Sequence, residues 1–113
     1  HEGKADAPSG TAIATAKGMA AARDKPFVVP PTQKENVPGT RGGAVDGVTI
    51  HSVRLPGLVA HQEVILGGSG ETLHIRHDSL SRESFMPGVL LAVREVMNRQ
   101  ELVLGLERLI GLT

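Results

Sequence analysis

The stretch Leu58 to His77, LVAHQEVILGGSGETLHIRH, decides the fold of this 113-residue chain. It holds two runs rich in Val, Ile, Leu and Thr, residue types that favour strands, around the turn Gly67-Gly68-Ser69-Gly70. A connection this short favours an antiparallel hairpin, because a parallel crossover needs about a dozen residues. We therefore predict antiparallel strands over Leu58 to Leu66 and Thr72 to His77.

A third strand is predicted before this hairpin, over Val48 to Leu55, with Pro56-Gly57 as the turn. Three strands joined by short turns form a meander. Apolar side chains alternate onto both faces of the strand from Leu58 to Leu66. The second face is therefore expected to meet either another subunit or helices on that side. One face carries Leu58, Ala60, Val64 and Leu66, and the other carries Val59 and Ile65.

A first helix is predicted over Ala12 to Arg23, because this stretch is rich in alanine and follows Ser9, a good N-cap residue. Its thin apolar stripe of Ile13, Ala16 and Ala20 is expected to pack on a sheet.

A second helix is predicted from about Met86 to Arg99, with Pro87 in its first turn, where the missing N–H costs little. The tail is predicted to form a short strand over Leu102 to Leu104 and then a helical turn. The apolar stripe that defines this helix is Val89, Leu90, Val93, Val96 and Met97.

Prolines and glycines interrupt the segment from Asp24 to Gly47, which is predicted to be a long connection without regular structure. Such a loop is either functional, or lies across a neighbouring subunit, or is a flexible insertion. The predicted fold is thus α+β: a mostly antiparallel mixed sheet of about four strands on two main helices, with a long Pro/Gly-rich loop.

The composition of the chain argues against several classes of function. Lys plus Arg and Asp plus Glu number twelve each, so no strong field attracts nucleic acid or an anionic membrane. The chain has no cysteine, and we expect no metal site: His74 and His77, three residues apart in a strand, would face opposite sides, and His51 and His61 have no partners in sequence. Without a signal pattern or an apolar run of about 20 residues, a cytoplasmic location is the default expectation.

The segment Asp6-Ala7-Pro8-Ser9-Gly10-Thr11 leads into the first predicted helix, whose first N–H groups lack intrahelical partners and carry partial positive charge. Gly10 lets a ligand approach the backbone, Thr11 adds a hydroxyl, and Lys4 adds a full charge. The segment is therefore either a carboxylate site or an ordinary capped helix with a solvated lysine.

The same segment resembles dihydrodipicolinate reductases. That family carries two adjacent histidines, two variable residues, a lysine, one variable residue and then D-A-P-S-G-T; this chain shows His1, Lys4 and Asp6 to Thr11 at that spacing. The resemblance continues through Arg41-Gly42, the stretch SVRLPGLVAHQEVILGGSGETLHIRHDSLSR and FMPGVLLAV, essentially to Thr113.

The resemblance implies a reductase of diaminopimelate and lysine biosynthesis, which moves hydride from NADH or NADPH to a cyclic dicarboxylate. Lys4 would be the proton donor, and His1, Gly10 and Thr11 would bind the substrate carboxylate. The family's first histidine would precede residue 1. Residues 1–113 would be the C-terminal substrate-binding and oligomerisation domain.

The dinucleotide-binding domain of the family is missing from this sequence, which holds no G-x-x-G-x-x-G. We therefore expect this fragment to bind no cofactor and to be inactive alone. In the family this domain also joins four sheets into the core of a homotetramer. The alternatives are an oligomerisation domain without catalysis and a generic anion-binding domain.

Overall fold

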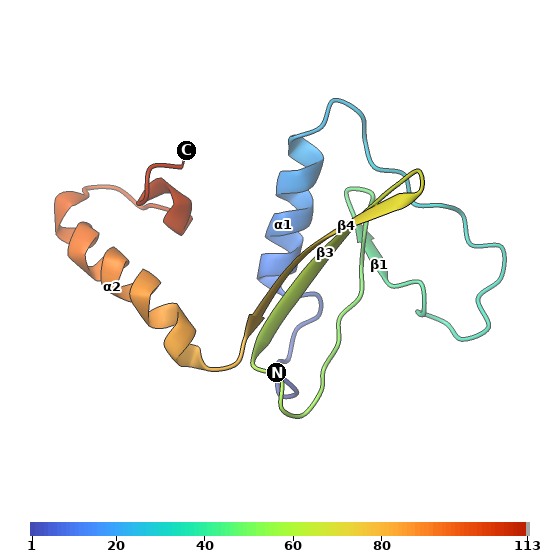
Figure 1. Ribbon diagram of the computed structural model, residues 1–113, viewed down its shortest axis with the longest axis horizontal. Helices are drawn as coiled ribbons and strands as arrows, with labels where there is room; N and C mark the ends of the chain where they lie inside the picture. The colour runs from blue at the N-terminus through green and yellow to red at the C-terminus, as the bar shows by residue number, and fades with distance from the viewer. Residues whose placement is uncertain (113) are drawn as a thin grey trace. The chain divides into compact units, whose positions relative to one another are not determined.

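The computed structural model describes residues 1–112 and has the predicted α+β composition (Figure 1). Two helices and four strands are present among these residues, and every paired strand is antiparallel. The chain divides into two compact units, residues 1–58 and residues 59–113.

Helix α1 spans Gly10–Ala21 and begins two residues before its predicted start. Ser9 is its N-cap, as predicted: the Ser9 hydroxyl oxygen accepts a hydrogen bond of 3.1 Å from the backbone N–H of Ala12. Ala16, on the predicted apolar stripe, is 2% exposed, and α1 packs on the first of the two sheets. The cap therefore fixes where the helix begins, and a small side chain allows its close approach to the strands.

The first sheet pairs β1 (Gly43–Val45) with β2 (Val48–Ile50) through a two-residue turn. Asp46 and Gly47 both have positive φ, 49° and 78°, which is the type I′ geometry that Asp-Gly favours. The prediction that the segment from Asp24 to Gly47 has no regular structure was therefore wrong for the last residues of that segment.

Strand β2 stops at Ile50 instead of continuing to Leu55. Gly42, directly before β1, has a φ of 72°, so β1 begins only at Gly43 and offers no partner to a longer β2. Because β2 ends there, the predicted three-stranded meander does not form, and the strands of residues 1–112 make two separate sheets of two strands.

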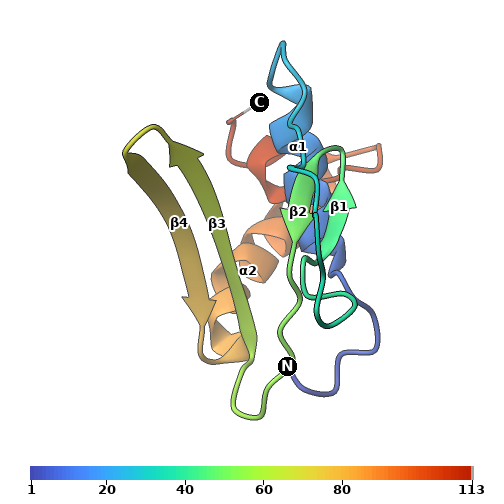
Figure 2. The same ribbon diagram turned by 90° about the vertical axis from the view of Figure 1, so that its right-hand side faces the viewer.

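The second sheet is the predicted hairpin (Figure 2); its first strand begins and ends two residues later than predicted, and its second strand is longer than predicted. Strand β3 spans Ala60–Gly68 and β4 spans Glu71–Ser79. The register places Val64 opposite Ile75 and Leu66 opposite Leu73, so these four apolar side chains share one face.

The two faces of this hairpin differ in character. On the apolar face, Leu73 and Ile75 are 56% and 59% exposed. On the other face Ile65 is 58% exposed and lies among ionisable side chains. The predicted two-sided apolar pattern is thus present, but one face is much richer in apolar groups.

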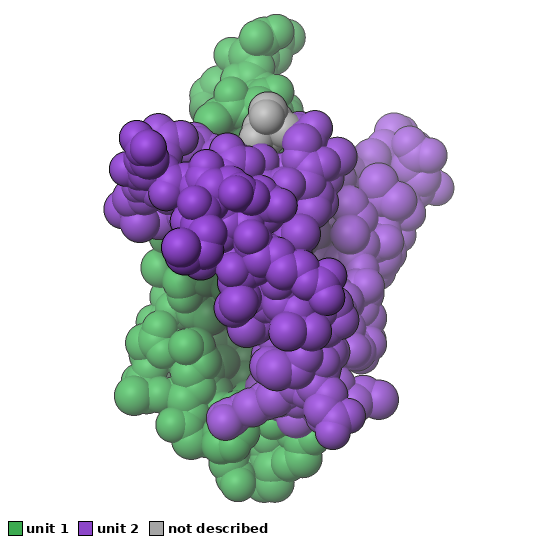
Figure 3. Space-filling model, turned by 90° about the vertical axis from the view of Figure 1, so that its left-hand side faces the viewer, with its two compact units in different colours: residues 1–58 green, residues 59–113 purple. Residues whose placement is uncertain are grey.

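The second unit, coloured separately in Figure 3, continues through the 3₁₀ turn η1 (Arg82–Phe85) into α2 (Met86–Glu95). Pro87 lies in the first turn of α2, as predicted. The final predicted turn winds instead as the 3₁₀ turn η2 (Val96–Asn98), a common way for a helix to end.

The tail forms the predicted helical turn, η3 (Leu106–Arg108), but not the predicted strand over Leu102 to Leu104. No strand of residues 1–112 pairs with that segment, and an isolated strand has no ladder to stabilise it.

The buried part of the molecule is small. Ala16 is the only buried hydrophobic residue of the described chain, and Ser79 is the only buried polar one. The Ser79 hydroxyl donates to the carbonyl of Ser81 at 3.0 Å and is also hydrogen-bonded to the Ser84 hydroxyl. Within residues 1–112, no helix has the length and apolar character needed to cross a membrane.

We predict that Gly47→Ala lowers the free energy of unfolding by about 1–3 kcal/mol. Gly47 has positive φ, and an added Cβ would clash with the carbonyl oxygen of Phe27. Urea unfolding followed by far-ultraviolet circular dichroism measures the change. Gly43→Ala is the control, since its Cβ would meet nothing within 4 Å; equal losses in both variants would contradict the prediction.

Candidate functional site

The N-terminal segment that carries the predicted site residues begins with a turn. The Lys4 backbone N–H donates to the His1 carbonyl at 3.3 Å, and the Gly3 N–H donates to His1 Nδ1 at 3.0 Å. The structure therefore brings His1 and Lys4, two of the predicted residues, into one short turn.

The ammonium of Lys4 is paired with the neighbouring carboxylate of Asp6. Lys4 Nζ lies 2.7 Å from Asp6 Oδ1, with the two side chains 38% and 61% exposed. The hydrogen bond from Lys4 is the largest cause that lowers the pKa of Asp6 below its usual 3.8. Because exposed ion pairs contribute little to stability, an incoming dianion can replace Asp6 as the partner of Lys4 at small cost.

Gly10 and Thr11 occupy the first positions of α1, as the site hypothesis requires. The Ala12 N–H is taken by the Ser9 hydroxyl, and the Ile13 N–H by the Ser9 carbonyl at 3.0 Å. The N–H groups of Gly10 and Thr11 have no intrahelical acceptor, by the geometry of any helix start. They are exposed, and a carboxylate is the kind of ligand that such groups bind.

The predicted residues thus form two pairs rather than one cluster. Within residues 1–112, no hydrogen bond or ion pair joins the Lys4 ammonium to Gly10 or Thr11; it contacts Asp6. This role of Asp6 was not predicted from the sequence, although the K-x-D spacing in the motif was a usable signal. Nor was that of Arg54, which contacts the segment from far along the chain.

A cavity of about 610 Å³ lies beside this segment, within the first unit. Ala7 and Pro8 form one part of its wall, and the loop and strands around β1 and β2 form the rest. The cavity places open space next to the residues that link Lys4 to α1. The other lining residues are Gly39, Thr40, Gly42, Gly43, Ala44, Val45, Ile50, His51, Ser52 and Val53.

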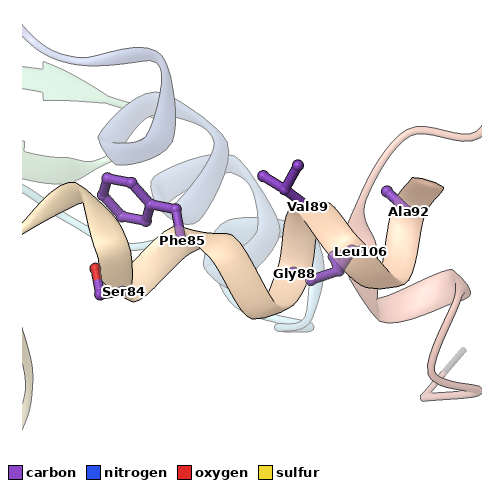
Figure 4. A pocket seen from close by; sticks show the side chains of 6 residues that line it. All are labelled: Ser84, Phe85, Gly88, Val89, Ala92 and Leu106. Carbon is purple, nitrogen blue, oxygen red and sulfur yellow. The ribbon is translucent and has the colours of Figure 1, made fainter. Parts of the chain in front are cut away.

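A second cavity, of about 490 Å³, lies against α2 and has a different character (Figure 4). Phe85 and Val89 project from the same side of the helix, and the Leu106 side chain lies against Gly88. No ionisable side chain lines it, so it offers no charge to an anion. Its full lining is Ser84, Phe85, Gly88, Val89, Ala92 and Leu106.

The histidines of the hairpin lie on the faces that the sequence predicted. The register puts His74 and His77 on opposite faces. His61, which has no metal-ligand partner in sequence, lies across from the carboxylate of Asp78, with Nδ1 2.6 Å from Oδ1. His74 Nδ1 lies 2.8 Å from Glu63 Oε1 on the same face. Such cross-strand pairs become visible only once the register is known.

Neither a metal nor a dinucleotide fits the described residues. Residues 1–112 contain no group of three or more His, Cys, Asp or Glu side chains arranged to hold a metal ion. A nicotinamide dinucleotide is held by a strand, a glycine-rich turn and a helix in a parallel sheet. In residues 1–112 both sheets are antiparallel, and α1 follows a loop rather than a strand.

Residues 1–110 match the family model described as "Dihydrodipicolinate reductase, C-terminus". The chain is 58% identical, over 99% of its length, to the 4-hydroxy-tetrahydrodipicolinate reductase of Mycobacterium ulcerans, of which it covers 46%. It is 54% identical, again over 99% of its length, to the enzyme of that name from Dehalococcoides mccartyi, of which it covers 42%. The chain thus spans less than half the length of these relatives.

A solved structure shows the same likeness. It is described as dipicolinate-bound dihydrodipicolinate reductase from Paenisporosarcina sp. TG-14, and it aligns with a TM-score of 0.79 at 50% identity. The alignment covers 96% of this chain and 41% of that one.

We predict that the β3–β4 hairpin loses stability in acid because of Asp78. Arg76 Nε lies 2.7 Å from Asp78 Oδ2. The hydrogen bond from Arg76 is the largest cause that lowers the pKa of Asp78 below 3.8, and the hydrogen bond with His61 is the second. A carboxyl with a lowered native pKa stabilises the fold above its unfolded pKa, and the contribution is lost as pH falls through the native value.

The difference in free energy of unfolding between wild type and Asp78→Asn should therefore shrink between about pH 5 and about pH 2. Arg76→Gln, which removes the largest cause, should reduce that pH dependence. Urea titrations at each pH measure both effects, and a difference that stays constant with pH would contradict the prediction.

Proposed function

The chain belongs to the dihydrodipicolinate reductase family, as its C-terminal domain, and on that premise we propose that it holds the cyclic dicarboxylate substrate of a reductase. The observation that carries the proposal is the start of α1, where the exposed backbone of Gly10 and Thr11 follows a short loop from Lys4. The related structure named as dipicolinate-bound supports a ligand of this class.

In the proposed complex, one substrate carboxylate accepts hydrogen bonds from the Gly10 and Thr11 N–H groups and the Thr11 hydroxyl. His1 contacts the same carboxylate. The Lys4 ammonium exchanges its exposed pairing with Asp6 for the substrate and donates a proton from Nζ to the ring during reduction. The chain's own contribution is thus binding, orientation and proton donation.

We propose that the whole protein is a 4-hydroxy-tetrahydrodipicolinate reductase of diaminopimelate and lysine biosynthesis, working in the cytoplasm. Its hydride would come from NADH or NADPH, for which residues 1–112 offer no fitting site. The 113-residue chain alone is therefore expected to bind the dicarboxylate without turning it over. A generic anion-binding domain without catalysis is the alternative.

We further propose that the chain assembles into a homotetramer through its β3–β4 hairpin. Ile65 and Ile75, on opposite faces of the hairpin, are more than half exposed, and Leu73 adds to the face of Ile75. Exposed apolar strands commonly lie in interfaces. Assembly and substrate binding are compatible roles, and an assembly role without catalysis is the second alternative.

Binding is tested by calorimetric titration of the chain with pyridine-2,6-dicarboxylate. We expect Lys4→Ala to weaken the affinity about tenfold or more, because a charge-assisted contact is lost, and added salt to weaken wild-type binding. Lys17→Ala, on the exposed surface of α1, is the control and should bind as wild type. Absence of wild-type binding at about millimolar ligand would reject the substrate role.

Assembly is tested by light scattering. The wild-type chain is expected to have a mass several times 11.9 kDa. The double variant Ile65→Lys/Ile75→Lys places a charge on each face of the hairpin and should shift the mass towards the monomer. Thr49→Lys, an exposed position on β2, should leave the mass unchanged. A monomeric wild type would remove the tetramer proposal.

A further inference from the structure

We propose that Arg54 is a positioning residue for substrate binding, which acts by holding the main chain of the segment between Lys4 and α1. The inference rests on the function proposed above for that segment. It assigns a task to a side chain that lies outside the motif and 48 residues from its contact in the sequence.

The guanidinium of Arg54 joins two separate stretches of backbone. Its Nη2 donates to the carbonyl oxygen of Asp6 at 2.6 Å, and its Nη1 donates to the carbonyl of Val53 at 2.9 Å. The planar fork of arginine suits such a bridge, since its donors are fixed relative to one another. Both acceptors are main-chain atoms, so the contact restrains the path of the chain itself.

This bridge connects two parts of the lining of the cavity beside the motif. Ala7 and Pro8, which follow Asp6 directly, line one part of the cavity, and Val53 lines another. Arg54 thus fixes the spacing of two walls by holding residues within or next to each of them. Its side chain is half-buried, and its Nε is buried without a hydrogen-bond partner among residues 1–112.

The charge of the guanidinium strengthens the contact. A hydrogen bond from a charged donor is stronger than one between neutral groups, and a half-buried guanidinium is costly without acceptors. The Asp6 carboxylate is paired with Lys4, so Arg54 holds the Asp6 carbonyl while Lys4 holds its side chain. The charge of Arg54 also contributes, after that of Lys4, to the lowered pKa of Asp6.

Two anchors therefore define the loop that leads into the helix. Arg54 holds it at the carbonyl of Asp6, and the Ser9 cap holds it at the first turn of α1. Between them lies Pro8, whose ring restricts the backbone further. Losing the Arg54 anchor should let Lys4 move relative to the helix start while the cap keeps α1 intact.

The test compares wild type, Arg54→Gln and Arg54→Lys in the 113-residue chain. Pyridine-2,6-dicarboxylate affinity is measured by calorimetry, and the backbone N–H groups of Asp6, Ala7 and Ser9 are followed by ¹⁵N nuclear magnetic resonance. We expect Arg54→Gln to weaken binding about tenfold, with amide shifts concentrated in that segment and unchanged helicity. Arg54→Lys should recover part of the affinity, because it keeps the charge but supplies only one point of contact.

Arg94→Gln, in α2, is the matched control and should leave both readouts unchanged. If the wild type binds and Arg54→Gln binds equally well, the role of Arg54 is overturned and the proposed function stands. If the wild type does not bind, the proposed function fails, and the role of Arg54 in substrate binding fails with it. If Arg54→Gln unfolds, Arg54→Lys is used for the test instead. Wild-type affinity together with wild-type amide chemical shifts in Arg54→Lys would overturn the positioning role of Arg54.

Discussion

The scarcity of buried apolar surface is the constraint on which the rest of this structure depends. A chain of about this size buries a limited fraction of its surface, and here Ala16 is the only buried hydrophobic side chain of residues 1–112. The elements are therefore held by main-chain ladders, helix caps and polar tethers. The hydrogen bonds from the Ala12 N–H to the Ser9 hydroxyl and from Arg54 to the Asp6 carbonyl hold elements that a larger core would hold in another protein. Large exposed side chains on the hairpin remain available to a partner surface.

The candidate site is likewise built from few residues. Its charges come from a few neighbouring residues: the Lys4 ammonium, the Asp6 carboxylate and the positive start of α1. The ammonium and the helix start would attract the proposed carboxylate ligand, which would need these groups at fixed positions. That requirement explains why a distant arginine, through a main-chain carbonyl, matters for a site whose chemical groups are contiguous in sequence.

The features predictable from sequence were those with local causes. Ser9 caps α1, Pro87 lies in the first turn of α2 and Ser69-Gly70 closes the long hairpin, because each residue type determines the backbone beside it. The motif likewise identified the family. β1 was missed because its neighbouring glycines were taken only as breakers, although Asp46-Gly47 is a hairpin signal. Arg54 carries no local signal, since its role arises only when distant segments meet.

The two hairpin turns differ in how they would tolerate added residues. Gly47 lies against the Phe27 carbonyl, so the turn of the short hairpin is enclosed by the preceding loop. Gly70 also has positive φ, but a side chain there would meet nothing within 4 Å. Exposed turns of small residues are where insertions are best accepted. Within this chain, an epitope or a spectroscopic label therefore belongs at Ser69-Gly70, far in sequence from the motif, and not at Asp46-Gly47.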